Sequence, residues 1–270
     1  MSTPAATSDS IFLLDGERFM PTEHARGPWD PRALHGGAPA ALIATAFERV
    51  QPGDELTIGR LSFELLRPIP LAPLTLATSI VRAGRRVQEL AAELLAGDEL
   101  IARASALRVQ PVPADAADAA AAPSRIDAPM PGPDEAEPLR FALDDSDEAS
   151  FAATAMEMRS FEPRHGVPPG RVWMRLRHPL LPGEPPTPLA RLAATADFGN
   201  GVSAALPFDR FLFINADLTV HLERPPRGEW IGLDARTLVR KGGTGMAEGV
   251  LHDVHGPVGR SFQTLVVQPR

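Results

Sequence analysis

The chain has 270 residues, 44% of them hydrophobic, enough to build the core of one large domain or of two smaller units. Its formal net charge of −7 argues against nucleic acid as a partner, since phosphate contacts need clustered Lys and Arg, and the lack of cysteine excludes disulfides and cysteine nucleophiles. The sequence shows neither a signal-peptide pattern nor an apolar run of about 18 residues, so we expect a cytoplasmic protein without membrane insertion.

The first half of the chain reads as one helix followed by four strands. Near-helical spacing of apolar residues after a glycine pair predicts a helix over 35–50. Pro39 fits the first turn of this helix, where its missing N–H costs nothing. Runs rich in Val, Ile, Leu and Thr, separated by proline and glycine, predict strands over 56–66, 74–82, 87–95 and 100–109.

A stretch rich in proline and acidic residues follows these strands. Pro111 to Pro138 contain seven prolines and six acidic residues. Such a stretch has little to bury and repeatedly interrupts regular hydrogen bonding, so it is predicted to be a linker. We therefore expect two units, over 1–110 and 151–270, joined by a linker over 111–150.

The second half repeats the element order of the first. A helix is predicted over 188–199, and strands over 211–223, 230–239, 245–252 and 257–267. A shift of 157 residues superimposes the two halves without gaps from the helix to the last strand, and places Arg67-Pro68 on Arg224-Pro225. Identity is low, so the shared order of elements is the stronger evidence for an internal duplication.

The two copies differ in polarity inside their predicted elements. Three positions that are apolar in the first copy are polar in the second: Ala40 against Asp197, Ile58 against Asn215, and Ala106 against Gln263. A buried polar group costs free energy unless it has a hydrogen-bond partner. Three such changes in one copy predict a hydrogen-bonded cluster of Asp197, Asn215 and Gln263.

The opposite asymmetry lies at the start of the first helix. His35-Gly36-Gly37 corresponds to Leu192-Ala193-Ala194, which has no glycine. Glycines at a helix start allow close backbone approach, and the free N–H groups there can hold an oxyanion. We therefore expect one composite site, with the helix start from one copy and the polar cluster from the other, and an inactive site at the symmetric position.

Each of these residues also has a purely structural interpretation. In it, Asp197 bonds the local backbone near a helix end, and Asn215 is a satisfied strand or bulge residue. Gln263 is then a partly exposed strand residue, His35 a structural group at the helix entry, and the glycine pair serves only tight helix–sheet packing. The remaining histidines include His221, His252 and His255; they lack metal-ligand spacing, so no metal site is predicted.

Four segments carry a family resemblance: HGGAPAALIA, ADFGNG, NADLTVHLERPPRGEWIGLDART and GRSFQTLVV. Over most of 10–109 and 153–268 the chain resembles the acyl-CoA thioesterase II (TesB-like) family. The resemblance implies an α+β protein with a double hotdog fold: two tandem hotdog repeats, each with a long central helix wrapped by an antiparallel β-sheet. It also implies an acyl-CoA substrate, no cofactor other than the coenzyme A of that substrate, and a homodimer or higher homo-oligomer.

In that family an Asp, a Thr or Ser, and a Gln position a hydrolytic water. The matching motifs put Asp197 in the Asp place and Gln263 in the Gln place, while Asn215 stands where the family has a hydroxyl. An amide can still hydrogen-bond to water, and a different register would nominate Thr219 instead. The implied reaction is hydrolysis of acyl-CoA to free fatty acid and coenzyme A, with Asp197 as the base or the orienting acceptor.

Two other functions stay open. Asp30 and His35 have an Asp-x4-His spacing just before a helix, which resembles an enoyl-CoA hydratase or dehydratase motif, although the characteristic Asn-Pro before the histidine is absent. The other is a non-catalytic acyl-CoA-binding protein, because Asn215 stands where the family has the Thr or Ser that helps to position the water. Fold alone does not decide between these functions.

Overall fold

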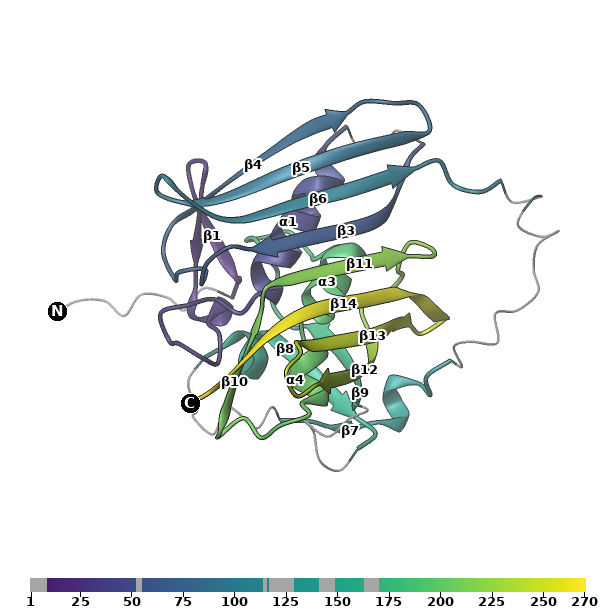
Figure 1. Ribbon diagram of the computed structural model, residues 1–270. Helices are drawn as coiled ribbons and strands as arrows, with labels where there is room; N and C mark the ends of the chain where they lie inside the picture. The colour runs from purple at the N-terminus through teal and green to yellow at the C-terminus, as the bar shows by residue number, and fades with distance from the viewer. Residues whose placement is uncertain (1–8, 52–54, 114–115, 117–128, 141–148, 163–169) are drawn as a thin grey trace.

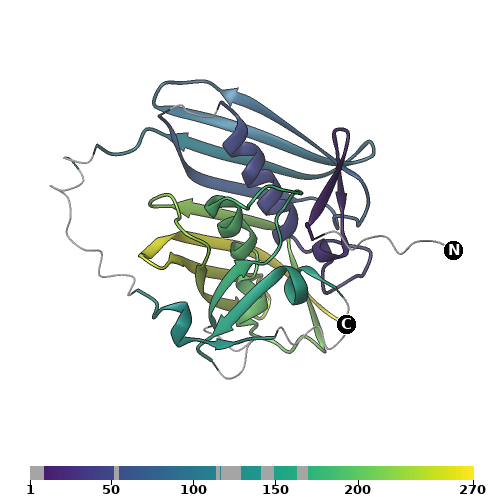
Figure 2. The ribbon, with the colours of Figure 1, turned by 180° about the vertical axis from the view of Figure 1, so that it is seen from behind.

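The structure is a computed structural model, and it describes residues 9–51, 55–113, 116, 129–140, 149–162 and 170–270. In these residues the strands form one large antiparallel sheet that the two halves of the chain share. Two helices, α1 (Gly37–Arg49) and α3 (Pro188–Ala196), lie against the same face of the sheet (Figures 1 and 2). The main apolar core fills the space between these helices and the sheet.

The predicted elements are present with small changes in their bounds. The first half contains β1 (Phe12–Asp15), β2 (Arg18–Pro21), η1 (Glu23–Ala25), α1, β3 (Thr57–Leu65), β4 (Leu74–Arg82), β5 (Val87–Ala96) and β6 (Glu99–Val109). The second contains η3 (Phe151–Ala155), β8 (Met156–Ser160), β9 (Gly170–Leu176), α3, α4 (Gly199–Ser203), β10 (Phe211–Asn215), β11 (Asp217–Leu222), β12 (Ile231–Val239), β13 (Gly245–Asp253) and β14 (Gly256–Pro269). The short strands β1, β2, β8 and β9 were not predicted. None of the helices among the described residues combines the length and hydrophobicity needed to cross a membrane.

The strand pairing repeats at a spacing of 157 residues. Strand β3 pairs with β11 at the centre of the sheet, and Ser62 faces Thr219, its own counterpart at this spacing. On either side the registers match: Leu76 pairs with Leu94 in the first half, as Leu233 pairs with Leu251 in the second. The shift of 157 residues is therefore confirmed over the strands, and a pseudo-twofold axis passes through the pair of Ser62 and Thr219.

A β-bulge occurs at the same place in both halves. In β3 the register shifts between Ile58 and Arg60. In the second half Ala216 takes the place of Gly59 and separates β10 from β11, so the prediction of one strand over 211–223 is wrong at this point. An extra residue bends the strand and redirects the neighbouring side chain, and that neighbour is Asn215.

The helices do not follow the spacing of the strands. Helix α3 begins at Pro188, 151 residues after the start of α1 at Gly37, because Thr187 caps it and accepts a hydrogen bond from Ala190 N (3.1 Å). The gap-free superposition is therefore wrong over the helices. Ala40 is therefore not the structural equivalent of Asp197. Gly36-Gly37 is likewise not the structural equivalent of Ala193-Ala194.

Helices α1 and α3 instead run antiparallel with their ends alongside each other. At one end a Cβ on Gly37 would lie only 2.7 Å from the carbonyl oxygen of Ala194. At the other end Thr187 Oγ1 donates to Glu48 Oε2 at 2.6 Å. This close approach brings the start of α1 against the end of α3.

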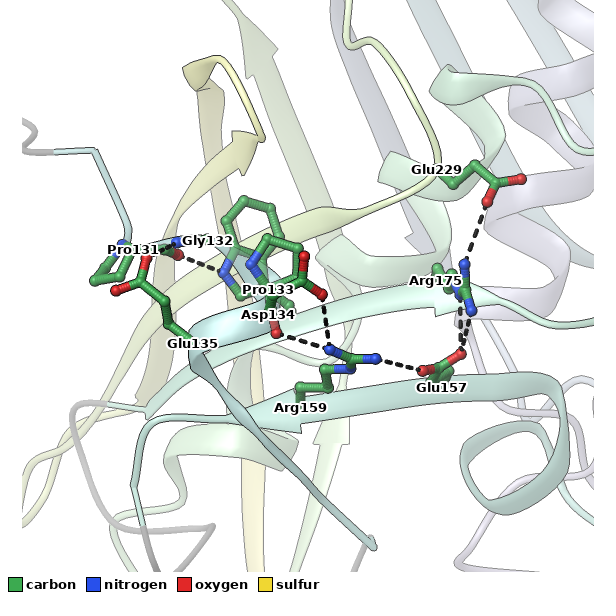
Figure 3. Close-up of polar contacts among 10 residues, drawn as sticks. Pro131, Gly132, Pro133, Asp134, Glu135, Glu157, Arg159, Arg175 and Glu229 are labelled. Atoms are coloured by element: carbon green, nitrogen blue, oxygen red, sulfur yellow. Dashed lines mark hydrogen bonds and ion pairs between the residues drawn. The ribbon is translucent and has the colours of Figure 1, made fainter.

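The end of the predicted linker packs against the sheet, in contrast to the expectation that 111–150 has little to bury. Of this stretch the structure describes 111–113, 116, 129–140 and 149–150, including η2 (Pro133–Glu135) and β7 (Glu137–Pro138). Trp173 Nε1 donates to the carbonyl oxygen of Pro131 (2.8 Å), and Arg159 to that of Pro133 (3.1 Å) (Figure 3). Residues 129–140 are therefore part of the second half.

Candidate active site

Asp197 lies where the end of α3 meets the start of α1. It is the C-cap residue of α3, and its side chain is 4% exposed. The N-cap residue of α1 is Gly36, and a Cβ placed there would lie 2.8 Å from Asp197 Oδ2. A glycine is therefore required at position 36, because any side chain there would occupy the place of the Asp197 carboxylate against the start of α1.

Asn215 and Gln263 both contact Asp197, as predicted. Asn215 Nδ2 donates to Asp197 Oδ1 at 2.8 Å from the end of β10, beside the bulge. Gln263 Nε2 donates from β14 to the main-chain oxygen of Asp197 at 3.0 Å. The three residues come from α3, β10 and β14, and the structure brings them together.

Gln263 is buried at 2% exposure, so its interpretation as a partly exposed strand residue is wrong. Its Oε1 accepts from the N–H of Asn200 (3.3 Å), while its Nε2 bonds Asp197. Both ends of the amide are engaged with the turn between α3 and α4. Gln263 therefore fixes the position of Asp197.

His35 also contacts Asp197, which the sequence did not predict. His35 Nδ1 lies 3.0 Å from Asp197 Oδ2, and the imidazole stacks on Phe198 with ring centroids 4.3 Å apart. The centroid of the Phe151 ring lies 5.1 Å away. The imidazole is packed against two aromatic rings, which lie 6.1 Å from each other, and has one nitrogen on the carboxylate.

The glycine pair supplies one candidate oxyanion donor where two were expected. The N–H of Gly37 donates to His35 Nδ1 at 3.0 Å and is engaged by that bond. The N–H of Gly36 forms no hydrogen bond with any described residue. Gly36 therefore stays a candidate donor, and Gly37 does so only when His35 Nδ1 does not accept its proton.

Two alternatives from the sequence fail on geometry. Thr219 Oγ1 contacts Ser62 (3.5 Å) on the pseudo-twofold axis, so the register that would nominate it in place of Asn215 is wrong. Asp30 accepts from the N–H (2.9 Å) and the Nη2 (2.9 Å) of its neighbour Arg32. Asp30, which the spacing of the hydratase motif relates to His35, lines the same cavity but shares no hydrogen bond with that ring; His35 contacts Asp197.

Four of the candidate residues line a cavity of about 490 Å³: His35, Gly36, Asp197 and Asn215. Gly37 and Gln263 are not part of its wall, and its remaining lining is largely apolar. Asn200, which the sequence did not single out, also lines it and belongs to the ADFGNG segment. Among the described residues, no group of His, Asp and Glu is arranged to hold a metal ion.

Changing Gly36 to Ala tests how closely the carboxylate and the helix start must approach. The backbone of Gly36 is helical (φ −59°), so alanine adds only its methyl group, which would displace Asp197. A displacement of about 1 Å costs roughly 100-fold in rate, and we expect a loss of that order in turnover. Gly132→Ala is the matched control, because a Cβ at Gly132 meets nothing closer than 3.7 Å. Full activity of Gly36→Ala would contradict a role for this approach.

Family models match both halves of the chain. The family model of the acyl-CoA thioesterase N-terminal domain matches residues 25–109, and that of the C-terminal domain matches residues 116–267. Among proteins with curated functions, none matches the chain.

Solved structures of similar proteins share the fold. A candidate thioesterase from Novosphingobium aromaticivorans is 20% identical with a TM-score of 0.69, over 95% of this chain and 98% of that one. A hot dog protein from Alicyclobacillus acidocaldarius is 18% identical with a TM-score of 0.68, over 99% of both chains. An acyl-CoA thioesterase II from Mycobacterium marinum is 16% identical with a TM-score of 0.64, over 96% of this chain and 93% of that one. The matched domains and the shared fold make this chain a hotdog protein that belongs to the acyl-CoA thioesterase family.

Proposed function

We propose that the protein hydrolyses acyl-CoA thioesters to a free fatty acid and coenzyme A. In this proposal it is a double hotdog whose repeats share one site, the first over 1–110 and the second over 151–270 together with the segment 129–140 that packs on it. The observation that carries the proposal is Asp197 on the wall of a largely apolar cavity in a member of this family. Its carboxylate accepts from Asn215 Nδ2 and its main-chain oxygen from Gln263 Nε2.

The geometry supports attack by water on the thioester carbonyl. A water in the cavity beside Asp197 attacks the carbonyl carbon, and the oxygen that becomes negative faces the N–H of Gly36. General-base assistance contributes roughly 100- to 10,000-fold, and one oxyanion donor about 100- to 1,000-fold. The reaction needs no cofactor, because coenzyme A enters as part of the substrate and leaves as the thiol.

The cavity suits an acyl thioester better than a small polar molecule. Its lining includes Trp29, Ile69, Leu212 and Phe213, which offer apolar surface to an acyl chain. A narrow void of about 10 Å³ continues from Asp197 between α1 and the sheet. The reacting carbonyl would therefore lie at the polar wall with its chain against the apolar lining.

A thiol-release assay tests the proposal directly. We expect the purified protein to release one thiol and one carboxylate per acyl-CoA consumed, in a screen of short, medium and long chains. Calorimetric binding of acyl-CoA without any thiol release would identify a non-catalytic binding protein. Hydration of an enoyl-CoA without thiol release would identify a hydratase.

A further inference from the structure

We infer that His35 is the proton acceptor for the hydrolytic water, and that Asp197 orients its imidazole. This inference rests on the proposed function and deepens it. It assigns the proton transfer to a residue whose partner lies 162 positions away in the sequence and whose ring contacts that partner directly.

The imidazole of His35 is packed against two aromatic rings and held at one nitrogen. Phe198 stacks on the ring (4.3 Å between centroids), and Phe151 lies 5.1 Å away. The main-chain N–H of His35 donates to the carbonyl oxygen of Ala25 at 3.0 Å, which fixes the backbone at the helix entry. A base held in this way keeps its free nitrogen in one place.

The contacts of Asp197 determine which ring nitrogen carries the proton. Asp197 Oδ1 accepts from Asn215 Nδ2, and Asp197 Oδ2 lies 3.0 Å from His35 Nδ1. A carboxylate only accepts, so this second contact is a hydrogen bond when Nδ1 carries the proton. The neutral imidazole then has its lone pair on Nε2.

The bond from the N–H of Gly37 to Nδ1 describes the other protonation state of the same ring. One nitrogen cannot both donate to Asp197 and accept from Gly37. When Nδ1 donates to Asp197, the N–H of Gly37 loses this acceptor. The state that makes Nε2 basic is thus the one that frees a second N–H at the start of α1.

His35 is better placed than Asp197 to receive a proton from water. Both carboxylate oxygens of Asp197 already contact a side chain, and the carboxylate is 4% exposed. His35 lines the 490 Å³ cavity, and none of the described residues hydrogen-bonds to its Nε2. A carboxylate–histidine pair in which the acid sets the tautomer and the far nitrogen takes the proton is an established arrangement for a general base.

The proton and electron transfers balance. The water oxygen bonds to the carbonyl carbon as one water proton passes to His35 Nε2, and the carbonyl electron pair moves to its oxygen. When the carbonyl re-forms, the C–S bond breaks and coenzyme A leaves as a thiolate. That thiolate takes the proton from Nε2, which leaves a carboxylic acid, a thiol and a neutral imidazole.

His35→Asn separates the two roles of the ring. The Asn amide can still donate to Asp197 from near the Nδ1 position, but it has no base at the Nε2 position. We expect kcat to fall by about 100- to 10,000-fold with KM changed little. The pH profile of kcat should change as well, because the group that accepts the proton is lost. His221→Asn is the matched control, because His221 is exposed on β11.

Chemical rescue by imidazole tests the role of His35 as a base, because added imidazole would not restore activity if the ring were only structural. His35→Ala leaves the space beside Phe198 and Phe151 that the ring fills, and added imidazole should restore part of the thiol release. Unchanged circular dichroism and unfolding temperature in both variants will show that the fold persists.

The outcomes separate this inference from the proposed function. If the wild-type protein releases no thiol from any acyl-CoA, both fail. If the wild type is active, Asp197→Asn is inactive, and His35→Asn keeps its rate and its pH profile, only the inference on His35 is overturned. Loss of activity in His35→Ala without imidazole rescue, together with an unchanged pH profile in His35→Asn, also assigns the ring a structural role.

Discussion

Asp197→Asn is expected to lower thiol release by about 100- to 10,000-fold while the fold is retained. Asparagine has nearly the same shape and can still accept from Asn215 Nδ2, which lies 2.8 Å from Oδ1. It removes the negative charge, and an amide NH2 facing His35 would favour the ring tautomer with the proton on Nε2. The site would then keep its geometry and lose its base. Steady-state thiol release measures the effect.

Asp209→Asn is the matched control for this change, because Asp209 is an exposed acid in the same half of the chain. We expect its rate to equal that of the wild type. The unfolding temperature of Asp197→Asn should stay close to the wild-type value, since Gln263 bonds the main-chain oxygen of residue 197, which the substitution keeps. If Asp197→Asn keeps a rate within a few-fold of the wild type, the carboxylate of Asp197 is not required for the reaction.

Asp253→Ala is expected to give the largest loss of stability, about 3–5 kcal/mol in the free energy of unfolding. Asp253 is buried and accepts from Arg224 Nη1 (2.6 Å) and Nη2 (2.7 Å). It also accepts from the main-chain N–H groups of Arg227 (3.0 Å) and His255 (2.8 Å). Its removal would leave a guanidinium and two N–H groups without their acceptor. Urea unfolding at neutral pH measures the loss.

The stabilisation by Asp253 should depend on pH. Burial alone would raise the pKa of Asp253, but the hydrogen bonds from Arg224, with those from His255 and Arg227, outweigh it and lower the pKa. Because its pKa is lower in the folded state, the ionised Asp253 stabilises the fold at pH values above its unfolded-state pKa of about 3.9. This stabilisation is lost as the pH falls from there through the lower pKa of the folded state. The difference between wild type and Asp253→Ala should therefore shrink in acid. Asp134→Ala, which removes an exposed ion pair with Arg159, should change stability little. Equal stabilities of wild type and Asp253→Ala at neutral pH would show that the pair contributes nothing.

The sequence predicted where both helices lie in the chain, but the correspondence between the two halves holds only for the strands. Period and turn residues placed β4 at its observed bounds, and the spacing of 157 residues holds in the strand registers. It fails at α3, because Thr187 and Pro188 start that helix by their own local capping. Nothing in the residues near Ala216 marks the bulge, since neither glycine nor proline occurs there.

The candidate site could be predicted only in part, because some of its contacts depend on how the two helices pack. Asn215 and Gln263 were found through motif and polarity, and they lie on the paired strands β10 and β14. Asp197 was found through its motif, because its comparison with Ala40 does not hold in the structure. The contact of His35 with Asp197 depends on how two helices pack side by side, and no periodicity in the sequence reports that distance.

The pseudo-twofold axis through Ser62 and Thr219 relates the two ends of the antiparallel helix pair α1 and α3 to each other. Asp197 faces the start of α1 at one end, and Glu48 faces the start of α3 at the other, where burial raises the pKa of Glu48. In a pair of identical subunits every mutation appears twice and alters both ends together. With both halves encoded in a single chain, selection can modify one end while the opposite end keeps only the packing that holds the helices together.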